Sequence, residues 1–261
     1  MLQRLVFAPD QLQEQRINLT AEQEHYLCRV LRLQRGDRFI AMNGQGQSWL
    51  ARLMATDSAS IPLQAEILAA ISVNTELPMA ITLVIALPKG NGLDEVVRQA
   101  TELGVTRIAP VLSDLTLLNP SPQKVERWRR IAQEATEQSE RQIIPAILDP
   151  VTFAEHLQQA PMTHSKQQVT GYLCVTRHPS PHLQDCLMGK QQRAIDTRQE
   201  LLEIVLAIGP EGGWTETEIE QAIATGYQPV SLGPRILRAV TAPLVALSLI
   251  AASLEGLGSK D

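Results

Sequence analysis

Two segments near the C-terminus carry most of the functional information in the chain: Gly209-Pro210-Glu211-Gly212-Gly213-Trp214 and Leu232-Gly233-Pro234-Arg235-Ile236-Leu237-Arg238. Each follows a short apolar run, residues 203–208 and residues 229–232. Such runs are typical of buried parallel strands, and ligands of open α/β sheets bind just beyond the ends of these strands. Because glycine lets the backbone approach a ligand closely and proline fixes φ, the pattern predicts two stiff loops that form one small-molecule site.

Length and composition indicate a globular protein, since 261 residues with 44% hydrophobic content suffice for two domains. The apolar stretches are too short for a membrane span or a secretory signal, so we expect a cytoplasmic protein. The net charge of -5 argues against a general nucleic-acid binder, and RNA contact would require a local basic patch. The three cysteines lack metal-ligand spacing, so we expect neither a disulfide nor a metal.

Residues 1–74 are expected to form a small β-rich, barrel-like domain. Asn43-Gly44-Gln45-Gly46, between apolar runs at 38–42 and 49–54, is a hairpin signal. A further strand is expected at 63–68. Thr20 with Gln23 predicts a capping box that opens a short helix.

Residues 75–261 alternate between strand and helix patterns, which indicates an α/β domain with a mostly parallel sheet. The polar stretch at 178–199 is expected to be an irregular connection. The last helix, at 241–254, is apolar almost all round and is expected to be buried on several sides or to lie at a subunit interface. Further strands are expected at 81–87, 105–112, 143–148 and 171–175, and further helices at 93–103, 122–141 and 215–225.

Neither of the common nucleotide-binding fingerprints is present. The loops at 208–213 and 232–238 instead closely resemble the RsmE family of SPOUT-class methyltransferases, which methylate N3 of a uridine in 16S ribosomal RNA. The resemblance covers nearly the whole chain and is strongest in its last third. Further matching stretches are 25–32, 102–105, 127–132 and 137–139, with Arg141 and Pro145.

The resemblance implies a trefoil knot in the C-terminal domain, a PUA-like RNA-binding barrel before it, and a homodimer. It also implies S-adenosyl-L-methionine as the cofactor, and 16S ribosomal RNA or the small ribosomal subunit as the partner. The cofactor residues implied are Thr176, Ile208, Gly209, Pro210, Glu211, Gly212, Gly213, Leu232, Gly233, Ile236, Leu237 and Thr241.

Uridine N3 becomes nucleophilic only as its proton is lost, and the negative charge then spreads onto both flanking carbonyl oxygens. Arg238 and Arg235 are the candidates for stabilising that charge, because preorganised positive groups lower the barrier to such reactions. No metal is required. The family usually reads Arg-Thr-Glu-Thr where this chain has Arg238, Ala239, Val240 and Thr241, so a carboxylate base at that position is excluded. Family members often have a basic residue in the loop after the second strand of this domain, where this chain has residues 113–116.

Several residues have two interpretations. Arg29 and Arg32 are candidates for RNA contact or for a solvated helix face, and Lys89 for substrate contact or a simple loop charge. For Glu211 we favour a hydrogen bond to backbone over a catalytic role. Trp128 is expected in the core, and the arginines at 127, 129 and 130 on a solvated face. Competing functions are a non-catalytic RNA-binding or assembly factor and a methyltransferase acting on another RNA position.

Overall fold

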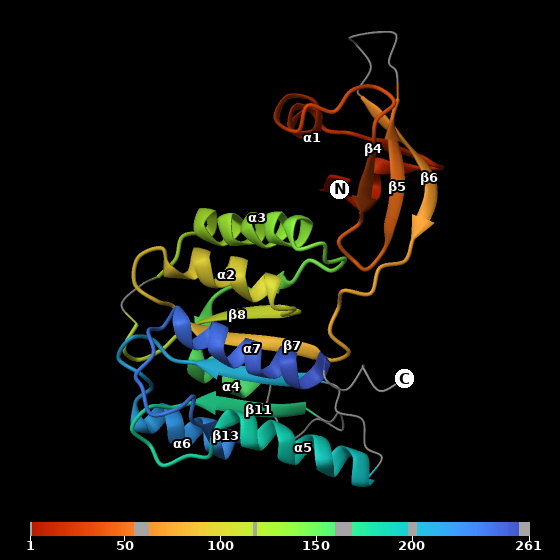
Figure 1. The fold of residues 1–261 in the computed structure, drawn as a ribbon. Coiled ribbons are helices and arrows are strands. Elements are labelled where there is room, and N and C mark those ends of the chain that lie inside the picture. The colour runs from red at the N-terminus through yellow and green to blue at the C-terminus, as the bar shows by residue number, and fades with distance from the viewer. Residues whose placement is uncertain (1, 55–62, 117–118, 160–168, 198–202, 256–261) are drawn as a thin grey trace. The chain divides into compact units, whose positions relative to one another are not determined.

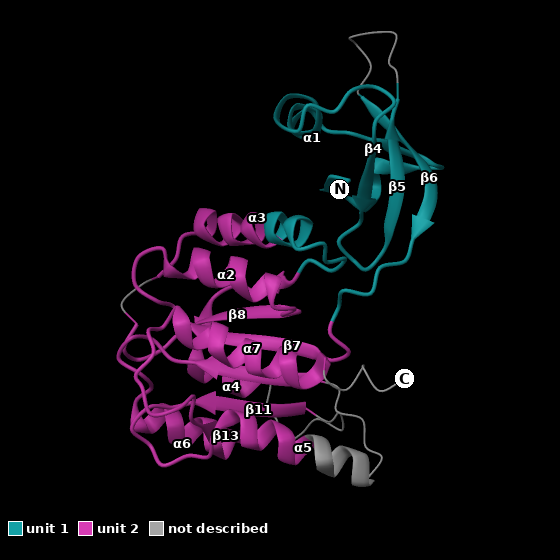
Figure 2. Ribbon diagram, in the orientation of Figure 1, with its two compact units in different colours: residues 1–76, 133–144 teal, residues 77–132, 145–261 magenta. Residues whose placement is uncertain are grey.

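The computed structural model describes residues 2–54, 63–116, 119–159, 169–197 and 203–255. The chain divides into two compact units (Figure 2). The first unit comprises Met1–Glu76 and Gln133–Ile144, and the second comprises Leu77–Ala132 and Pro145–Asp261. The domain boundary expected between residues 74 and 75 stays a prediction. That residues 133–144 belong with the first unit could not be read from the sequence, because these residues lie within and just after one long helix, α3 (Pro122–Gln138).

The first unit is built on a six-stranded sheet with the order β1-β4-β5-β6-β3-β2. Its strand pairs are antiparallel except for β1 with β4. The expected hairpin is confirmed as β4 and β5. The expected capping box at Thr20 is confirmed at the start of α1 (Ala21–His25), which continues into a π-helical turn, η2 (Tyr26–Val30). The strands are β1 (Arg4–Val6), β2 (Leu12–Gln13), β3 (Arg16–Asn18), β4 (Arg38–Met42), β5 (Ser48–Leu53) and β6 (Gln64–Ile71), and a short 3-10 turn, η1, spans Pro9–Gln11.

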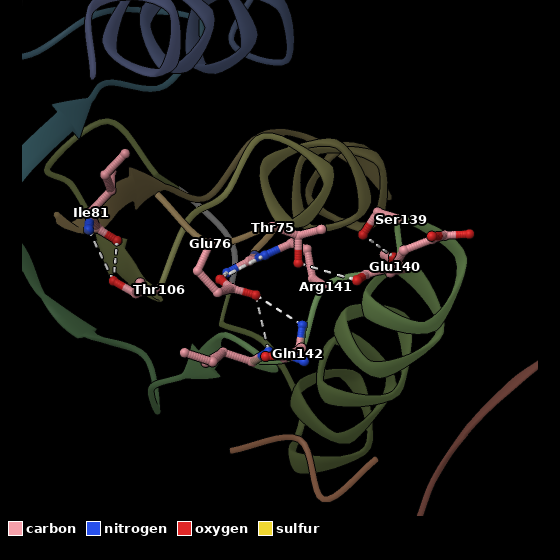
Figure 3. A network of polar contacts seen from close by, with 10 residues as sticks. Thr75, Glu76, Ile81, Thr106, Ser139, Glu140, Arg141 and Gln142 are labelled. Atoms are coloured by element: carbon pink, nitrogen blue, oxygen red, sulfur yellow. Dashed lines mark hydrogen bonds and ion pairs between the residues drawn. The ribbon is translucent and has the colours of Figure 1, made fainter. Parts of the chain in front are cut away.

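Residues 133–144 are held in the first unit by ion pairs and hydrogen bonds (Figure 3). The guanidinium of Arg141, only 2% exposed, donates to the carboxylate of Glu76 at 2.6 Å. The same carboxylate accepts hydrogen bonds from the backbone N–H groups of Gln142 and Ile143. Glu76 thus accepts hydrogen bonds from one buried guanidinium and two backbone N–H groups, which offset the cost of burying the Arg141 charge.

The second unit is an α/β domain around a seven-stranded sheet with the order β10-β8-β7-β12-β11-β13, in which β9 pairs with β8. Every registered pair in this sheet is parallel, which confirms the expected α/β class. The strands are β7 (Ala80–Ala86), β8 (Arg107–Leu112), β9 (Ala146–Ile147), β10 (Val151–Thr152), β11 (Val169–Cys174), β12 (Glu203–Ile208) and β13 (Tyr227–Val230).

Helices cover this sheet in two groups (Figure 1): α2 and α5 both contact α7, and α4 contacts α6. One correction concerns the polar stretch at 178–199, most of which forms the helix α5 instead of an irregular connection. Its apolar residues Leu183 and Leu187 are one helical turn apart and both buried, a spacing too sparse to stand out among polar neighbours. The helices are α2 (Gly92–Glu102), α4 (Phe153–Gln159), α5 (Leu183–Thr197), α6 (Glu216–Ala224) and α7 (Thr241–Glu255).

The strand order reverses direction between β7 and β12. From β7 the chain winds outward to β8 and β10, and after crossing the sheet it fills the other half with β11, β12 and β13. Parallel strands end at the same edge, so the loops that follow β7, β11, β12 and β13 lie at one end of the sheet, toward which the arrow of β11 points in Figure 1. A reversal of this kind is where α/β sheets bind ligands.

Candidate functional site

A cavity of about 270 Å³ lies at the ends of β11, β12 and β13 in the second unit. Its volume is just below the roughly 300–1,000 Å³ usual for small-molecule sites. Ten of the fourteen residues predicted for the cofactor and catalytic roles line it: Thr176, Ile208, Gly209, Pro210, Gly212, Gly213, Leu232, Gly233, Arg235 and Leu237. The two Gly-Pro loops therefore share one hollow, as the strand-end argument anticipated.

The first loop, residues 209–214, closes tightly on itself and on Trp214. Gly213 has φ of +78°, a conformation that side chains rarely adopt, and its N–H donates to the carbonyl of Pro210 at 2.9 Å. A Cβ on Gly209 would lie 3.2 Å from Trp214 Nε1 and 3.3 Å from the backbone of Gly213. Trp214 in turn stacks on Phe153 with ring centroids 4.2 Å apart. A side chain at Gly209 would press against this anchored indole, so glycine lets the loop backbone lie directly on it.

The loop after β8 braces this first loop. A Cβ on Gly212 would lie 3.0 Å from Leu115 Cδ1, so the two residues are in close contact. The Asp114 N–H donates to the carboxylate of Glu218, which also completes the capping box of α6 with Thr215. The segment 113–116 that replaces the expected basic residue thus has a structural part in the site.

The second loop carries the two arginines that the sequence singled out. Gly233 has φ of +107°, and its N–H donates to the hydroxyl of Ser231. The Arg238 carbonyl accepts hydrogen bonds from the N–H groups of Thr241 and Ala242 at the start of α7. Arg235 and Arg238 are exposed, and neither pairs with an acidic side chain within the part of the chain that the structure describes. Their positive charges are therefore available to an anion.

Four of the predicted residues do not line the cavity: Glu211, Ile236, Arg238 and Thr241. Ile236 is 63% exposed. The carboxylate of Glu211 accepts a hydrogen bond from the backbone N–H of Lys89 at 2.9 Å, which is the backbone hydrogen bond favoured from the sequence. Lys89 follows β7, and Glu211 follows β12, the strand that pairs with β7. The structure therefore brings Lys89, a candidate for substrate contact, together with Glu211, a candidate for cofactor contact.

Sequence reasoning missed several residues that line the cavity, among them Cys174, Arg177 and Glu216. Arg177 has φ of +59°, a strained conformation for a residue with a side chain. The rule that found the two Gly-Pro loops would have found it, because Arg177 follows the end of β11. Burial raises the pKa of the Cys174 thiol, which keeps it protonated and unsuited to act as a thiolate nucleophile.

Arg29 and Arg32 lie in the first unit, at the end of the π-helical turn η2 and just after it. Arg32 has φ of +58°. Neither forms an ion pair with any acid of the described ranges, in contrast to Arg4 and Arg52 of the same unit, which pair with glutamates. Positive φ and π-helical turns are both frequent at functional sites. RNA contact by the two arginines stays a prediction.

The described residues show neither a metal-binding cluster nor a membrane-spanning helix. They contain no group of three or more His, Cys, Asp and Glu side chains that could hold a metal ion. No helix formed by them is long and apolar enough to cross a membrane.

Comparison with known families identifies both parts of the chain. A family model described as an RNA methyltransferase domain matches residues 75–251. The chain belongs to this family. A second model, described as an RNA methyltransferase PUA domain, matches residues 19–60 and confirms the PUA-like character of the first domain.

Relatives of this methyltransferase family extend over most of the chain. A protein of Synechocystis named ribosomal RNA small subunit methyltransferase E is 49% identical over 98% of this chain and 79% of its own length. A protein of the same name from Bacillus subtilis is 28% identical over 91% of this chain and 90% of its own length. The family likeness therefore includes both domains.

Solved structures agree with this assignment. The ribosomal RNA small subunit methyltransferase E of Neisseria gonorrhoeae, bound to S-adenosyl methionine, is 31% identical with a TM-score of 0.80 over 97% of this chain and 98% of that one. A methyltransferase structure from Legionella pneumophila, with the same cofactor bound, is 26% identical with a TM-score of 0.81 over 97% of this chain and 98% of that one. The methyltransferase fold is thus shared along nearly the entire length.

Proposed function

We propose that this protein transfers a methyl group from S-adenosyl-L-methionine to N3 of a uridine in 16S ribosomal RNA. The observation that carries the proposal is the cavity shared by the loops at 208–213 and 232–237, at the strand ends of a methyltransferase domain. Relatives named small subunit methyltransferases, one of them with S-adenosyl methionine bound, support the cofactor and the ribosomal RNA substrate.

The residues around the cavity fit this cofactor. The glycines at 209 and 213 leave room where a Cβ would meet Trp214 or strain the backbone, so main-chain N–H and C=O groups can face a ligand. Trp214 Nε1 is a buried donor without a partner among the described residues. Arg177 and Arg235 line the same hollow and provide positive charge for a carboxylate such as that of the methionine moiety.

S-adenosyl-L-methionine supplies an electrophilic methyl group, and the protein must stabilise the anion that forms on the uracil ring. Arg238 and Arg235 have this role in our proposal, because both are exposed at the second loop and unpaired with described acids. Positive groups fixed in place before the reaction are effective, since they need no reorganisation as charge develops. Holding N3 in line with the methyl group contributes further.

The partners and the chain path follow the family resemblance. We propose that Arg29, Arg32 and Lys89 contact the RNA, that the protein acts as a homodimer in the cytoplasm, and that the C-terminal domain is knotted. The apolar helix α7 is compatible with a subunit interface, because several of its apolar residues are only partly buried in one chain.

Calorimetry with the purified chain tests the cofactor first, and a methylation assay on small ribosomal subunits tests the substrate. We expect micromolar affinity for S-adenosyl-L-methionine and S-adenosylhomocysteine, followed by incorporation of one methyl group at a uridine. Absence of binding in that range would favour the non-catalytic assembly factor. Binding with methylation at another position would reject N3 of uridine as the target.

A further inference from the structure

The turn after β7, residues 88–92, is held by the first cofactor loop through one hydrogen bond. Glu211 Oε1 accepts from the Lys89 N–H at 2.9 Å. Within the first loop, Pro210, Gly212 and Gly213 line the cavity, whereas Glu211 does not. Its carboxylate therefore projects from the cofactor loop to a turn at the neighbouring strand end.

The same turn contacts the chain that follows the second loop. A Cβ on Gly92 would lie 2.9 Å from Val240 Cγ1, so the backbone of Gly92 and the side chain of Val240 pack directly together. Val240 stands where the family resemblance expects an acid, and here it makes an apolar contact with the beginning of α2. Residues 88–92 are therefore contacted by Glu211 of the first loop and by Val240, which follows the second loop.

Other hydrogen bonds also hold the turn, among them one from the Gly92 N–H to the Lys89 carbonyl at 3.4 Å. Gly90 has φ of +66°, and its carbonyl accepts a hydrogen bond from Lys124 Nζ at 2.8 Å. The Lys89 side chain is exposed and forms no ion pair with the acids in the described residues. Its ammonium group is therefore free for a phosphate or another anion, while its position depends on how the backbone of the turn is held.

We propose that Glu211 is a positioning residue: it links the occupancy of the cofactor cavity to the placement of the turn that presents Lys89 to the RNA. This inference rests on the proposed function. A ligand that contacts the peptides on both sides of Glu211 shifts or rigidifies its backbone, and the carboxylate passes that change to the Lys89 N–H. Glu211 acts through Lys89 and does not touch the reacting atoms.

Selective labelling makes the hydrogen bond directly observable. The chain has only five lysines, Lys89, Lys124, Lys166, Lys190 and Lys260, so a protein labelled with ¹⁵N-lysine gives few amide resonances. The resonance of Lys89 is the one absent from a Lys89→Arg variant. We expect this resonance to shift when S-adenosylhomocysteine is added to the wild type. The shift should be absent in Glu211→Ala and largely restored in Glu211→Gln, which keeps an oxygen acceptor.

Kinetics provide the second measurement. Glu211→Ala should raise the KM for small ribosomal subunits roughly three- to tenfold, the range expected for loss of one partly exposed charged hydrogen bond. Its kcat and its affinity for S-adenosylhomocysteine should stay within about twofold of wild type, since a twofold change is only about 0.4 kcal/mol. Glu211→Gln should recover most of the KM. Glu220→Ala, an exposed acid on α6, is the matched control and should leave KM unchanged.

The outcomes separate this inference from the proposed function. A wild type that binds no cofactor or methylates no RNA contradicts the proposed function itself. An active wild type whose Lys89 resonance does not respond to cofactor overturns the inference, as does a Glu211→Ala variant with unchanged KM. Equal losses in cofactor affinity and KM would also overturn it, because Glu211 would then serve the cofactor.

Discussion

Arg238 sits where the second loop meets α7, with its carbonyl capping the helix and its side chain exposed. We expect Arg238→Ala to lower kcat by roughly 100-fold, as loss of a group that stabilises transition-state charge does. Cofactor affinity should change little, because Arg238 does not line the cavity. Single-turnover methylation and calorimetry measure the two effects.

The control for this experiment is Arg98→Ala, an exposed arginine on α2 that should change neither quantity. Equal losses of turnover and cofactor affinity in Arg238→Ala would mean that Arg238 positions the cofactor.

His156 provides a pH-dependent test of the second unit. Burial lowers the pKa of His156 below its ordinary 6.5, and its Nε2 lies 3.2 Å from the Tyr227 hydroxyl. The folded protein therefore keeps this ring neutral, while the unfolded chain takes up a proton as the pH falls through 6.5. The free energy of unfolding should fall as the pH drops below that value, since the unfolded state binds more protons there.

Urea unfolding at pH 7.5 and pH 5.5 measures this dependence, and we expect His156→Gln to reduce the difference between the two pH values. An unchanged difference would show that other groups dominate the pH dependence.

The sequence predicted the surroundings of some residues correctly and those of others only in part. Trp128 was predicted in the core from its place on an apolar helical stripe, and it is 1% exposed with its indole N–H donating to the buried Asp94. For Glu211, a hydrogen bond to a backbone group was predicted, but its partner Lys89 was not. Lys89 is remote in sequence and lies nearby only because β7 and β12 pair. Arg177 was not among the predicted site residues, although it follows the end of β11 as the two Gly-Pro loops follow β12 and β13.

At the level of elements, the positive φ of Gly213 predicts that adding one methyl group at this position affects cofactor binding. Gly213→Ala should weaken cofactor binding, because a side chain at φ of +78° costs about 1–2 kcal/mol and the loop would rearrange to avoid it. Gly189→Ala on α5 is the control: its Cβ would meet nothing within 4 Å, and it should stabilise the helix by roughly 0.5–1 kcal/mol. Calorimetry with S-adenosylhomocysteine compares the two, and equal affinities would contradict a cradle formed by the loop backbone.

The ion pair of Glu76 and Arg141 provides a second test among the elements. Glu76→Ala should destabilise the first unit by roughly 3–5 kcal/mol, because it leaves the 2%-exposed Arg141 without this carboxylate. Glu66→Ala, which removes the exposed pair with Arg52, should cost no more than about 1 kcal/mol. Denaturant unfolding measures both, and similar costs would show that burial does not decide the strength of this pair.

Elements with strong local signals were predicted correctly, such as the hairpin β4–β5, the capping boxes at Thr20 and Thr215, and the apolar strands β7, β8 and β12. The helix α5 was not predicted, because its sequence is polar and its apolar periodicity weak. Long-range ion pairs and hydrogen bonds, which place residues 133–144 in the first unit, leave no periodic trace in a sequence.

At the level of the whole molecule, family membership and the strand-end cavity converge on one activity, RNA methylation with S-adenosyl-L-methionine. The parallel sheet was predictable from the alternation of strands and helices. The knot and the homodimer are implied by family resemblance alone, since no local pattern encodes how a chain threads or which face meets a second copy.

The most direct test of the account is the modification state of ribosomal RNA in a strain that lacks the gene for this chain. Mass mapping of 16S ribosomal RNA should show loss of one 3-methyluridine, restored by the wild-type gene and not by one encoding Arg238→Ala. An unchanged level of 3-methyluridine in the deletion strain would contradict the central claim.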